Sequence, residues 1–185
     1  MKSYAKIPGL RIFGARVYAH WSVAVVAIAI LGMSARSLTM ALVGICSYFG
    51  MILLHEAGHA YFAKRQRLDR LSIRLSAIHG TCAYEKPESP EQEYIVAWGG
   101  VIAQLVVAIP LVVSNNFFAF ANIDPFGPIV AILGYYSLIV VAMNLIPAHG
   151  LDGGKAWRLL PLLVRRWRRN EFQPRKRRGN VRVVK

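Results

Sequence analysis

The chain has 185 residues, of which 55% are hydrophobic and 17% are charged, whereas a soluble domain carries roughly 25% charged residues. Lys and Arg outnumber Asp and Glu by 23 to 9, which gives a net charge of +14. The high apolar content excludes a disordered chain, and the clustering of the charge argues against a soluble fold. Two cysteines, Cys46 and Cys82, are too few for a disulfide framework or a four-thiolate zinc site. We therefore expect a small integral membrane protein with basic ends.

Four apolar stretches predict four membrane-spanning helices, since each is close to the roughly 20 residues that cross a bilayer core. In chain order they cover residues 18–35, 38–63, 95–113 and 126–146. A segment lying in the membrane interface is the alternative for the first stretch, which is the shortest. Its long basic flank and the lack of a small-residue cleavage site disfavour a signal peptide, so we interpret it as a retained helix.

The basic residues predict how these helices are oriented. Of the 23 Lys and Arg, 22 fall on one side of the membrane if all four stretches span it. Loops rich in Lys and Arg stay in the cytoplasm, so we expect both termini there. The expected location is the inner membrane if the source is bacterial.

The sharpest motif is His55-Glu56-Ala57-Gly58-His59, in the second stretch. Residues four apart share one face of a helix, so both imidazoles can reach one metal ion. Glu56, about 100° round the helix, can meet a metal-bound water without being a ligand. This pattern is typical of zinc hydrolases in which the Glu is the general base. The alternative is a set of polar residues at a helix end, but His55 lies about 25 Å into the stretch, where ionisable groups are costly.

A catalytic zinc needs a third protein ligand, and Asp152 is the candidate. It follows the fourth stretch, in a segment where Pro147 disfavours continued helix and three glycines allow the chain to fold back. Asp124 falls on the opposite side of the membrane. The other acids lie in charge-rich stretches typical of solvated faces: Asp69, Glu85, Glu88, Glu91, Glu93 and Glu171. The alternative for Asp152 is an N-cap of a helix that begins near Lys155.

A membrane-embedded His-Glu-x-x-His, followed about 85 residues later by Asn-x-x-Pro-x-x-x-Leu-Asp-Gly, resembles the site-2 protease family. These are intramembrane zinc metalloproteases that cut membrane-spanning segments of regulatory proteins. The resemblance covers roughly residues 38–155. It implies one zinc ion per chain held by His55, His59 and Asp152, with Glu56 activating a water molecule.

The resemblance also implies roles for two amide side chains. Asn144 would position the substrate or stabilise its oxyanion, where one donor can be worth about 3 kcal/mol. The family usually has Gly-Pro and then Asn early in the third span, where this chain has Gly99-Gly100 and then Gln104. Gln104 carries the same amide group as Asn on a side chain that is one methylene longer, and it is a candidate substrate-binding residue. His149 is a candidate ligand or proton shuttle, or else an exposed histidine.

In the connection between the second and third stretches, residues 72–84 partly alternate between apolar and polar and contain a glycine turn, which predicts a β-hairpin. In the family, a membrane-associated sheet here offers its edge to an unwound substrate by strand addition. Gly80, in the His79-Gly80 pair that replaces the family's two glycines, is therefore a candidate substrate-binding residue. A plain cytoplasmic hairpin is the alternative.

The predicted fold is an all-α multi-pass membrane bundle of about four helices with a small membrane-associated β-hairpin on the cytoplasmic side. Residues 1–155 would form an intramembrane metalloprotease core, and residues 156–185 a basic interfacial helix and tail that binds anionic lipid. The resemblance implies hydrolysis of a peptide bond in or next to the transmembrane segment of a membrane protein substrate. A non-catalytic protein that binds client helices around a structural metal is the rival hypothesis, and a metal transporter is a third. We expect no nucleic-acid partner, and the oligomeric state is left open.

Overall fold

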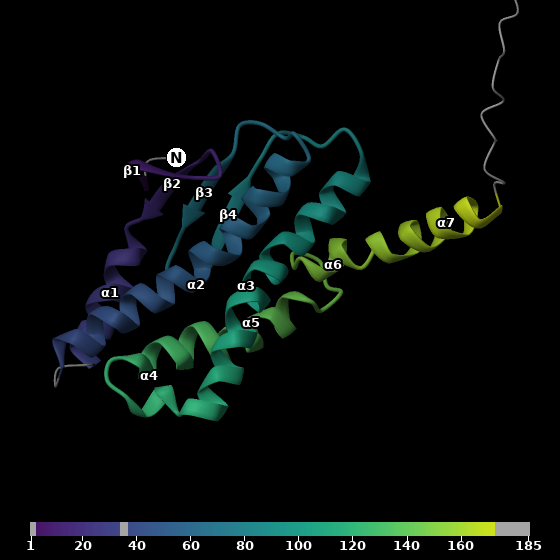
Figure 1. The fold of residues 1–185 in the computed structure, drawn as a ribbon. Helices are drawn as coiled ribbons and strands as arrows, with labels where there is room; N and C mark the ends of the chain where they lie inside the picture. Colours follow the sequence, from purple (N-terminus) through teal and green to yellow (C-terminus); the bar gives the residue numbers. More distant parts are fainter. Residues whose placement is uncertain (1–2, 34–36, 173–185) are drawn as a thin grey trace, which may run out of the picture.

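The structure, a computed structural model that describes residues 3–33 and 37–172, contains three long apolar helices (Figure 1). They are α2 (Leu38–Arg65), α3 (Pro90–Phe118) and a continuous helical segment, Phe126–Asn144. The third consists of α4 (Phe126–Ile129), the π-helical η2 (Val130–Tyr136) and α5 (Ser137–Asn144). Each of the three is long and apolar enough to cross a membrane, so the second, third and fourth predicted spans are present as helices.

The first predicted span is not confirmed as a spanning helix. Its residues 18–20 belong to strand β2 (Ala15–His20), and the 12-residue helix α1 (Ser22–Met33) follows. At 1.5 Å per residue α1 is about 18 Å long, which is short of a bilayer core of about 30 Å. α1 runs beside α2, where the side chain of Ile30 lies against Gly44.

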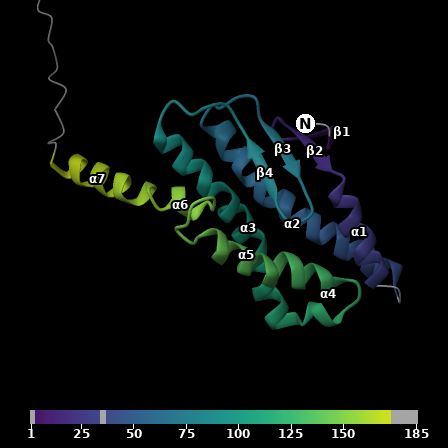
Figure 2. The ribbon, with the colours of Figure 1, turned by 180° about the vertical axis from the view of Figure 1, so that it is seen from behind.

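A four-stranded sheet lies along one side of α2 (Figures 1 and 2). Its strands, in spatial order, are β1 (Tyr4–Ile12), β2 (Ala15–His20), β3 (Ser72–Leu75) and β4 (Gly80–Ala83). β2 and β3 are parallel, whereas the outer pairs β1–β2 and β3–β4 are antiparallel. The predicted hairpin is therefore present as β3–β4, but it is half of a larger sheet to which the N-terminal residues add a second hairpin.

The buried core joins this sheet to the middle of α2. Alternate residues of β2 and β3 point at the helix, as the two-residue period of a strand requires. The core cluster consists of Ala15, Val17, Met51, Ile52, Ala60, Ile73 and Leu75. Its α2 members flank His55 to His59, so the packing fixes the sheet beside the metal-binding motif.

α2 and α3 approach closely where two glycines face each other. A Cβ atom at Gly58 would overlap the Gly99 carbonyl oxygen and the Cβ of Ala103, and a Cβ at Gly99 would meet the Gly58 carbonyl. Small residues at such a crossing let two membrane helices come into backbone contact. The crossing lies inside the metal-binding motif, so it also sets how near α3 comes to the histidines.

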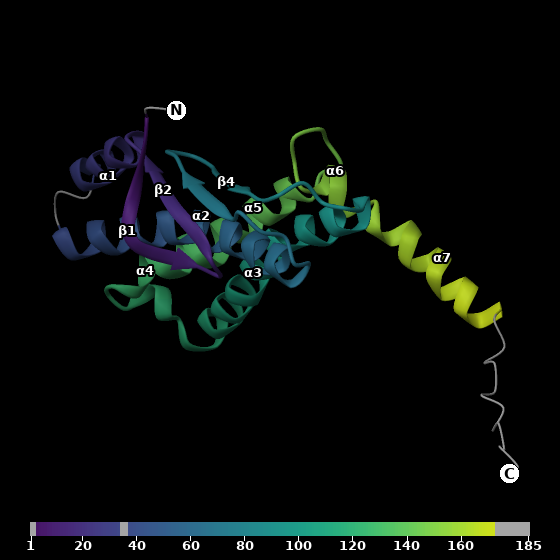
Figure 3. The same ribbon diagram turned by 90° about the horizontal axis from the view of Figure 1, so that it is seen from above.

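The chain beyond α5 turns back onto α3 and then leaves the bundle. A loop leads to the short helix α6 (Gly153–Ala156), which is followed by α7 (Leu159–Phe172). α7 extends away from the other helices (Figure 3). A single 3₁₀ turn, η1 (Phe120–Asn122), follows α3. The basic tail from residue 173 onward lies outside the described residues.

We predict that Gly58→Ala destabilises the protein while Gly50→Ala, in the same helix, does not. The added methyl at position 58 meets backbone of α3 and forces the helices apart, whereas position 50 faces open space. Overpacking costs about 1–3 kcal/mol, and replacing an unhindered helical glycine gains about 0.5–1 kcal/mol. Thermal unfolding in detergent measures the difference. Equal melting temperatures for the two variants would contradict the close crossing.

Candidate metal centre and active site

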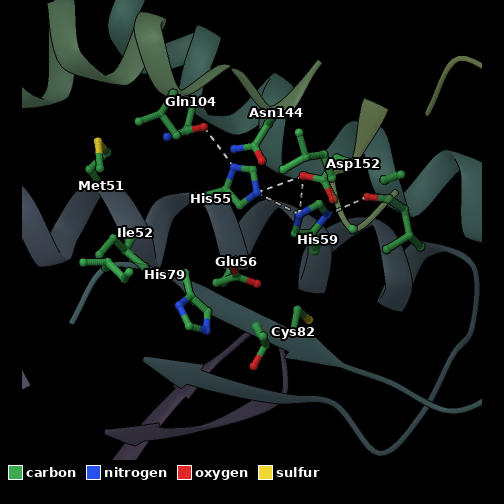
Figure 4. A pocket seen from close by; sticks show the side chains of 18 of the residues that line it. Met51, Ile52, His55, Glu56, His59, His79, Cys82, Gln104, Asn144 and Asp152 are labelled. Carbon is green, nitrogen blue, oxygen red and sulfur yellow. Dashed lines mark hydrogen bonds and ion pairs between the residues drawn. The ribbon is translucent and has the colours of Figure 1, made fainter. Parts of the chain in front are cut away.

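Three side chains from α2 and the loop before α6 converge on one point (Figure 4). Nε2 of His55 lies 3.0 Å from Oδ2 of Asp152, and Nε2 of His59 lies 3.2 Å from the same oxygen. The two Nε2 atoms are 3.0 Å apart. Among the described residues, this is the one group of three His, Cys, Asp or Glu side chains whose ligand atoms lie close enough to hold a metal ion.

The other ring nitrogen of each histidine is held by α3. Nδ1 of His59 lies 2.8 Å from the Val96 carbonyl oxygen, and Nδ1 of His55 lies 2.9 Å from Oε1 of Gln104. These oxygens only accept hydrogen bonds, so each Nδ1 carries a proton and donates it. Each Nε2 then presents a lone pair to its neighbours, and the carboxylate of Asp152 also only accepts. Three acceptors facing one another are stable together when a cation lies between them.

The spacing of these atoms fits zinc. Bonds of about 2.0–2.1 Å in a tetrahedral site place neighbouring ligand atoms about 3.3 Å apart, and the observed separations are 3.0 to 3.2 Å. Two imidazoles and one carboxylate suit zinc better than magnesium or calcium, which prefer oxygen ligands. When bound there, zinc would keep a fourth position open to the adjoining cavity, as in catalytic sites.

Two glycines of α3 make room for the imidazoles. Gly99 lies at the helix crossing, and a Cβ atom on Gly100 would stand only 2.5–2.7 Å from ring atoms of His55 and His59. The Gly99-Gly100 pair, in which the sequence departs from the family's usual Gly-Pro, therefore has a direct steric role here.

The loop that carries Asp152 is fixed to the two helices beside it. The Trp98 indole donates to the Ala156 carbonyl at 2.9 Å, and the Trp157 indole donates to the Leu145 carbonyl at 2.6 Å. A Cβ atom on Gly153 would overlap the Leu145 carbonyl oxygen, so only glycine allows the fold-back. These contacts place the Asp152 carboxylate beside the histidines rather than at solvent.

Asp152 precedes α6 but does not cap it. Its side chain makes no capping hydrogen bond, so the N-cap alternative is not supported. Without a metal ion, a proton on His55 or His59 can take the place of the cation; although burial alone would raise the pKa of Asp152, the hydrogen bonds and charges of the protonated imidazoles hold that pKa well below its usual range. The carboxylate is thus ionised and available as a ligand.

A cavity of about 510 Å³ opens beside the three ligands. Glu56, which is 5% exposed, lines it from α2, and Asn144 lines it from the end of α5. In Figure 4 the Asn144 carboxamide lies next to His55 and Asp152. The general base and amide donor of the sequence prediction are therefore placed on the same cavity as the metal ligands.

Gln104 and Gly80 also line this cavity, in positions that differ from a simple substrate contact. Gln104 is 1% exposed and orients His55 through its oxygen, while its Nε2 has no partner among the described residues. A Cβ atom on Gly80 would overlap the Glu56 side chain, so glycine lets strand β4 approach the carboxylate. His149, by contrast, is exposed and does not line the cavity.

Sequence reasoning missed two residues of the cavity wall. His79 lies in the β3–β4 turn with Nδ1 3.3 Å from the Ser76 hydroxyl, and its position beside the turn glycine was the available signal. Cys82 lies on β4, where burial and then the charge of Glu56 raise the pKa of its thiol to about 12. Cys82 is not among the side chains whose ligand atoms converge on the metal position.

Comparison with known proteins agrees with this geometry, although no family model matches the chain. It is 29% identical over 152 residues to a zinc metalloprotease of Methanocaldococcus jannaschii, covering 81% of this chain and 44% of that protein. It is 32% identical over 107 residues to a Synechocystis protein provisionally named as a zinc metalloprotease, covering 57% of this chain and 28% of that protein. The chain thus spans less than half the length of these curated relatives.

A solved structure shares the fold. The site-2 protease from Methanocaldococcus jannaschii matches with a TM-score of 0.66 and 25% identity, over 89% of this chain and 73% of that one. The apolar helices, the small sheet and the His-His-Asp cluster are consistent with a membrane protein of the zinc metalloprotease class. Together with the similar proteins above, they support a member of the site-2 protease family.

We predict that purified protein binds about one zinc ion per chain and that His55→Ala and Asp152→Ala each abolish or weaken this binding. A tetrahedral site cannot hold the metal as tightly with two protein ligands as with three. His149→Ala and Asp69→Ala are matched controls, since both side chains are exposed and lie outside the cavity. Metal analysis of detergent-purified variants is the measurement. Full zinc content in Asp152→Ala would show that the third ligand is wrongly assigned.

We also predict that Gln104→Leu lowers zinc affinity roughly 10- to 100-fold, the usual effect of removing the partner that orients a ligating histidine. The leucine cannot accept the His55 Nδ1 proton. Gln92→Leu is the control on the same helix, because Gln92 caps the start of α3 and donates to the Gln66 carbonyl but touches neither histidine. Competition with a chromogenic chelator reads out affinity, and an unchanged affinity for Gln104→Leu would remove this role.

Proposed function

We propose that the protein is an intramembrane zinc metalloprotease that hydrolyses a peptide bond in or next to a transmembrane segment of a membrane protein substrate. The observation that carries the proposal is the convergence of His55, His59 and Asp152, beside Glu56, on one cavity walled by apolar helices. A metal ion with a purely structural role would need neither the Glu56 carboxylate nor the cavity beside it. The similarity to zinc metalloproteases and to a solved site-2 protease supports the same chemistry.

The roles of the chain's own residues follow from their positions. Zinc, held by the three ligands, would supply Lewis acidity and lower the pKa of water near it. Glu56 accepts the proton of the attacking water as general base and later delivers it to the leaving amine. Asn144 donates its amide hydrogen to the developing oxyanion of the substrate, at a site from which most bulk water is excluded.

Substrate binding is assigned to the free edge of β4. Within the part of the chain that the structure describes, this strand pairs with β3 on one side only, and Gly80, Thr81 and Cys82 line the cavity. An unwound substrate segment can add there as a further strand, held by backbone hydrogen bonds with little demand on sequence. Because helical peptide bonds are shielded, Gly or Pro within the substrate helix favours cleavage.

The chain crosses the membrane four times in this proposal, with β2 and α1 together forming the first pass. The Lys64 ammonium lies beside Gly14, just before β2, so β2 begins level with the end of α2. A six-residue strand and a 12-residue helix extend about 20 Å and 18 Å, which suffices for a core of about 30 Å. β2 is paired on both sides, so its backbone is satisfied at membrane depth.

This topology supports a cytoplasmic location for both termini, with the sheet in the cytoplasmic half of the membrane. It places 22 of the 23 Lys and Arg on the side where α2 ends, which the positive-inside rule assigns to the cytoplasm. In a bacterial cell the membrane would be the inner membrane.

We predict that Glu56→Gln reduces cleavage roughly 10²- to 10⁴-fold while zinc content stays at the wild-type level, since only the proton acceptor is lost. Asn144→Leu should reduce the cleavage rate roughly 100-fold for loss of one oxyanion donor. Proteoliposomes containing reporter proteins with Gly- and Pro-rich transmembrane segments provide the assay, read by gel mobility.

Glu85→Gln is the matched control, because this exposed carboxylate lies outside the cavity. Equal cleavage by wild type and Glu56→Gln would show that Glu56 is not the base. Zinc-loaded wild type that retains reporter helices on purification, yet never cleaves them, would favour the client-binding hypothesis instead.

A further inference from the structure

Helix α7 presents an uncovered apolar stripe that begins at Trp157, just before the helix. Its members recur every three or four residues and therefore share one face. They are Trp157, Leu160, Leu163, Val164 and Trp167. The exposed fraction is 46% for Leu160 and 64% for Trp167, although α7 also has half-buried leucines, Leu159 and Leu162, on the side facing the protein. A stripe of this size in contact with water would be costly, so it requires a partner.

The flank of the stripe is basic. Arg158, in the turn before α7, is exposed, and so are Arg165 and Arg168, which helical spacing places on the arc beside the stripe. Of Arg165, Arg166 and Arg168, Arg166 alone takes part in the ion pairs found between described residues: its two terminal nitrogens lie 2.8 and 2.9 Å from the two carboxylate oxygens of Glu91. This pair of contacts holds α7 to the first turn of α3 and leaves Arg165 and Arg168 available for an outside partner.

The stripe starts where the lipid-facing surface of the bundle ends. Trp157 donates to the carbonyl of Leu145, directly after α5. Met143 and Ile146, on either side of that residue, are exposed apolar side chains at the same end of the bundle. The apolar surface therefore continues from a spanning helix onto α7, which extends away from the bundle (Figures 1 and 3).

We propose that α7 docks on the membrane surface, with the stripe Trp157 to Trp167 inserted at the headgroup boundary and Arg158, Arg165 and Arg168 binding anionic lipid headgroups. A helix with one apolar and one arginine-rich face matches that boundary, and each basic residue near an anionic surface contributes about 1 kcal/mol. A second copy of the chain is disfavoured as the occupant, because pairing two such faces brings arginines together. The proposal does not depend on proteolytic activity.

Site-directed spin labelling of the full chain in vesicles tests the proposal. In a background with Cys46→Ala and Cys82→Ala, single cysteines replace either stripe residues (Leu160, Leu163, Val164) or flank residues (Arg158, Arg165, Arg168). Vesicles of phosphatidylcholine are compared with vesicles that also contain phosphatidylglycerol. We expect stripe labels to collide with lipid-soluble oxygen and flank labels with a water-soluble nickel complex. The oxygen preference of the stripe should be several-fold greater in anionic vesicles and should fall with added salt.

The arginine contribution is tested with a label at position 163. Arg165→Gln with Arg168→Gln should reduce the difference between anionic and neutral vesicles, whereas Arg70→Gln, in the loop after α2, should not. Stripe labels as accessible to nickel as flank labels in anionic vesicles would overturn the proposal. Equal insertion in both kinds of vesicle would overturn the anionic assignment. Stripe labels shielded from both reagents, with spin–spin broadening, would show a second copy as the occupant.

Discussion

Three hydrogen-bond acceptors face one another in this bundle, and the packing around them serves to hold that unfavourable arrangement until a cation fills it. His55 and His59 point their Nε2 atoms at the Asp152 carboxylate because α3 accepts a hydrogen bond from each Nδ1. Those bonds exist only because α2 and α3 touch at glycines, where any side chain would separate them. Asp152 arrives from a distant part of the chain through a fold-back that also requires glycine. The metal-binding geometry is therefore a consequence of backbone contact between helices.

The sequence predicted the parts of this arrangement that follow local rules. Histidines four apart on an apolar helix must share a face, and three apolar stretches of adequate length form helices, as expected. The sequence did not predict strand β2 at the start of the first apolar stretch, because hydropathy does not distinguish a strand from a helix and the apolar residues of β2 run directly into α1. Phe13 and Gly14, with φ of 49° and 90°, form the turn between β1 and β2, and Gly14 was the available signal. The pairing of β2 with β3 joins residues about 55 positions apart, which no local pattern reveals.

The dependence on tertiary packing also explains why the interactions of Gln104 and Gly80 were not predicted from the sequence. Both were predicted as substrate contacts, and both do line the cavity. Their nearest interactions, however, are with His55 and Glu56 on another element. An amide or a glycine in a motif shows that a polar partner or a close approach is needed, but the identity of the neighbour depends on tertiary packing. Asp152 was predictable because chain direction and membrane depth restrict which acids can reach the histidines.

α3 connects the separate parts of the molecule. Its inner face supplies Val96 and Gln104 to the histidines, and Trp98 holds the loop that carries Asp152. Its first turn, at the membrane surface in the proposed topology, uses Glu93 to bind Lys155 at 2.7 Å and Glu91 to bind Arg166. Successive residues of a helix are about 100° apart around its axis. If α3 packed against α2 one residue out of place, its hydrogen bonds to the histidines and its ion pairs would therefore be lost together. Any force that membrane docking exerts on α7 therefore acts on the helix that sets the orientation of the metal ligands.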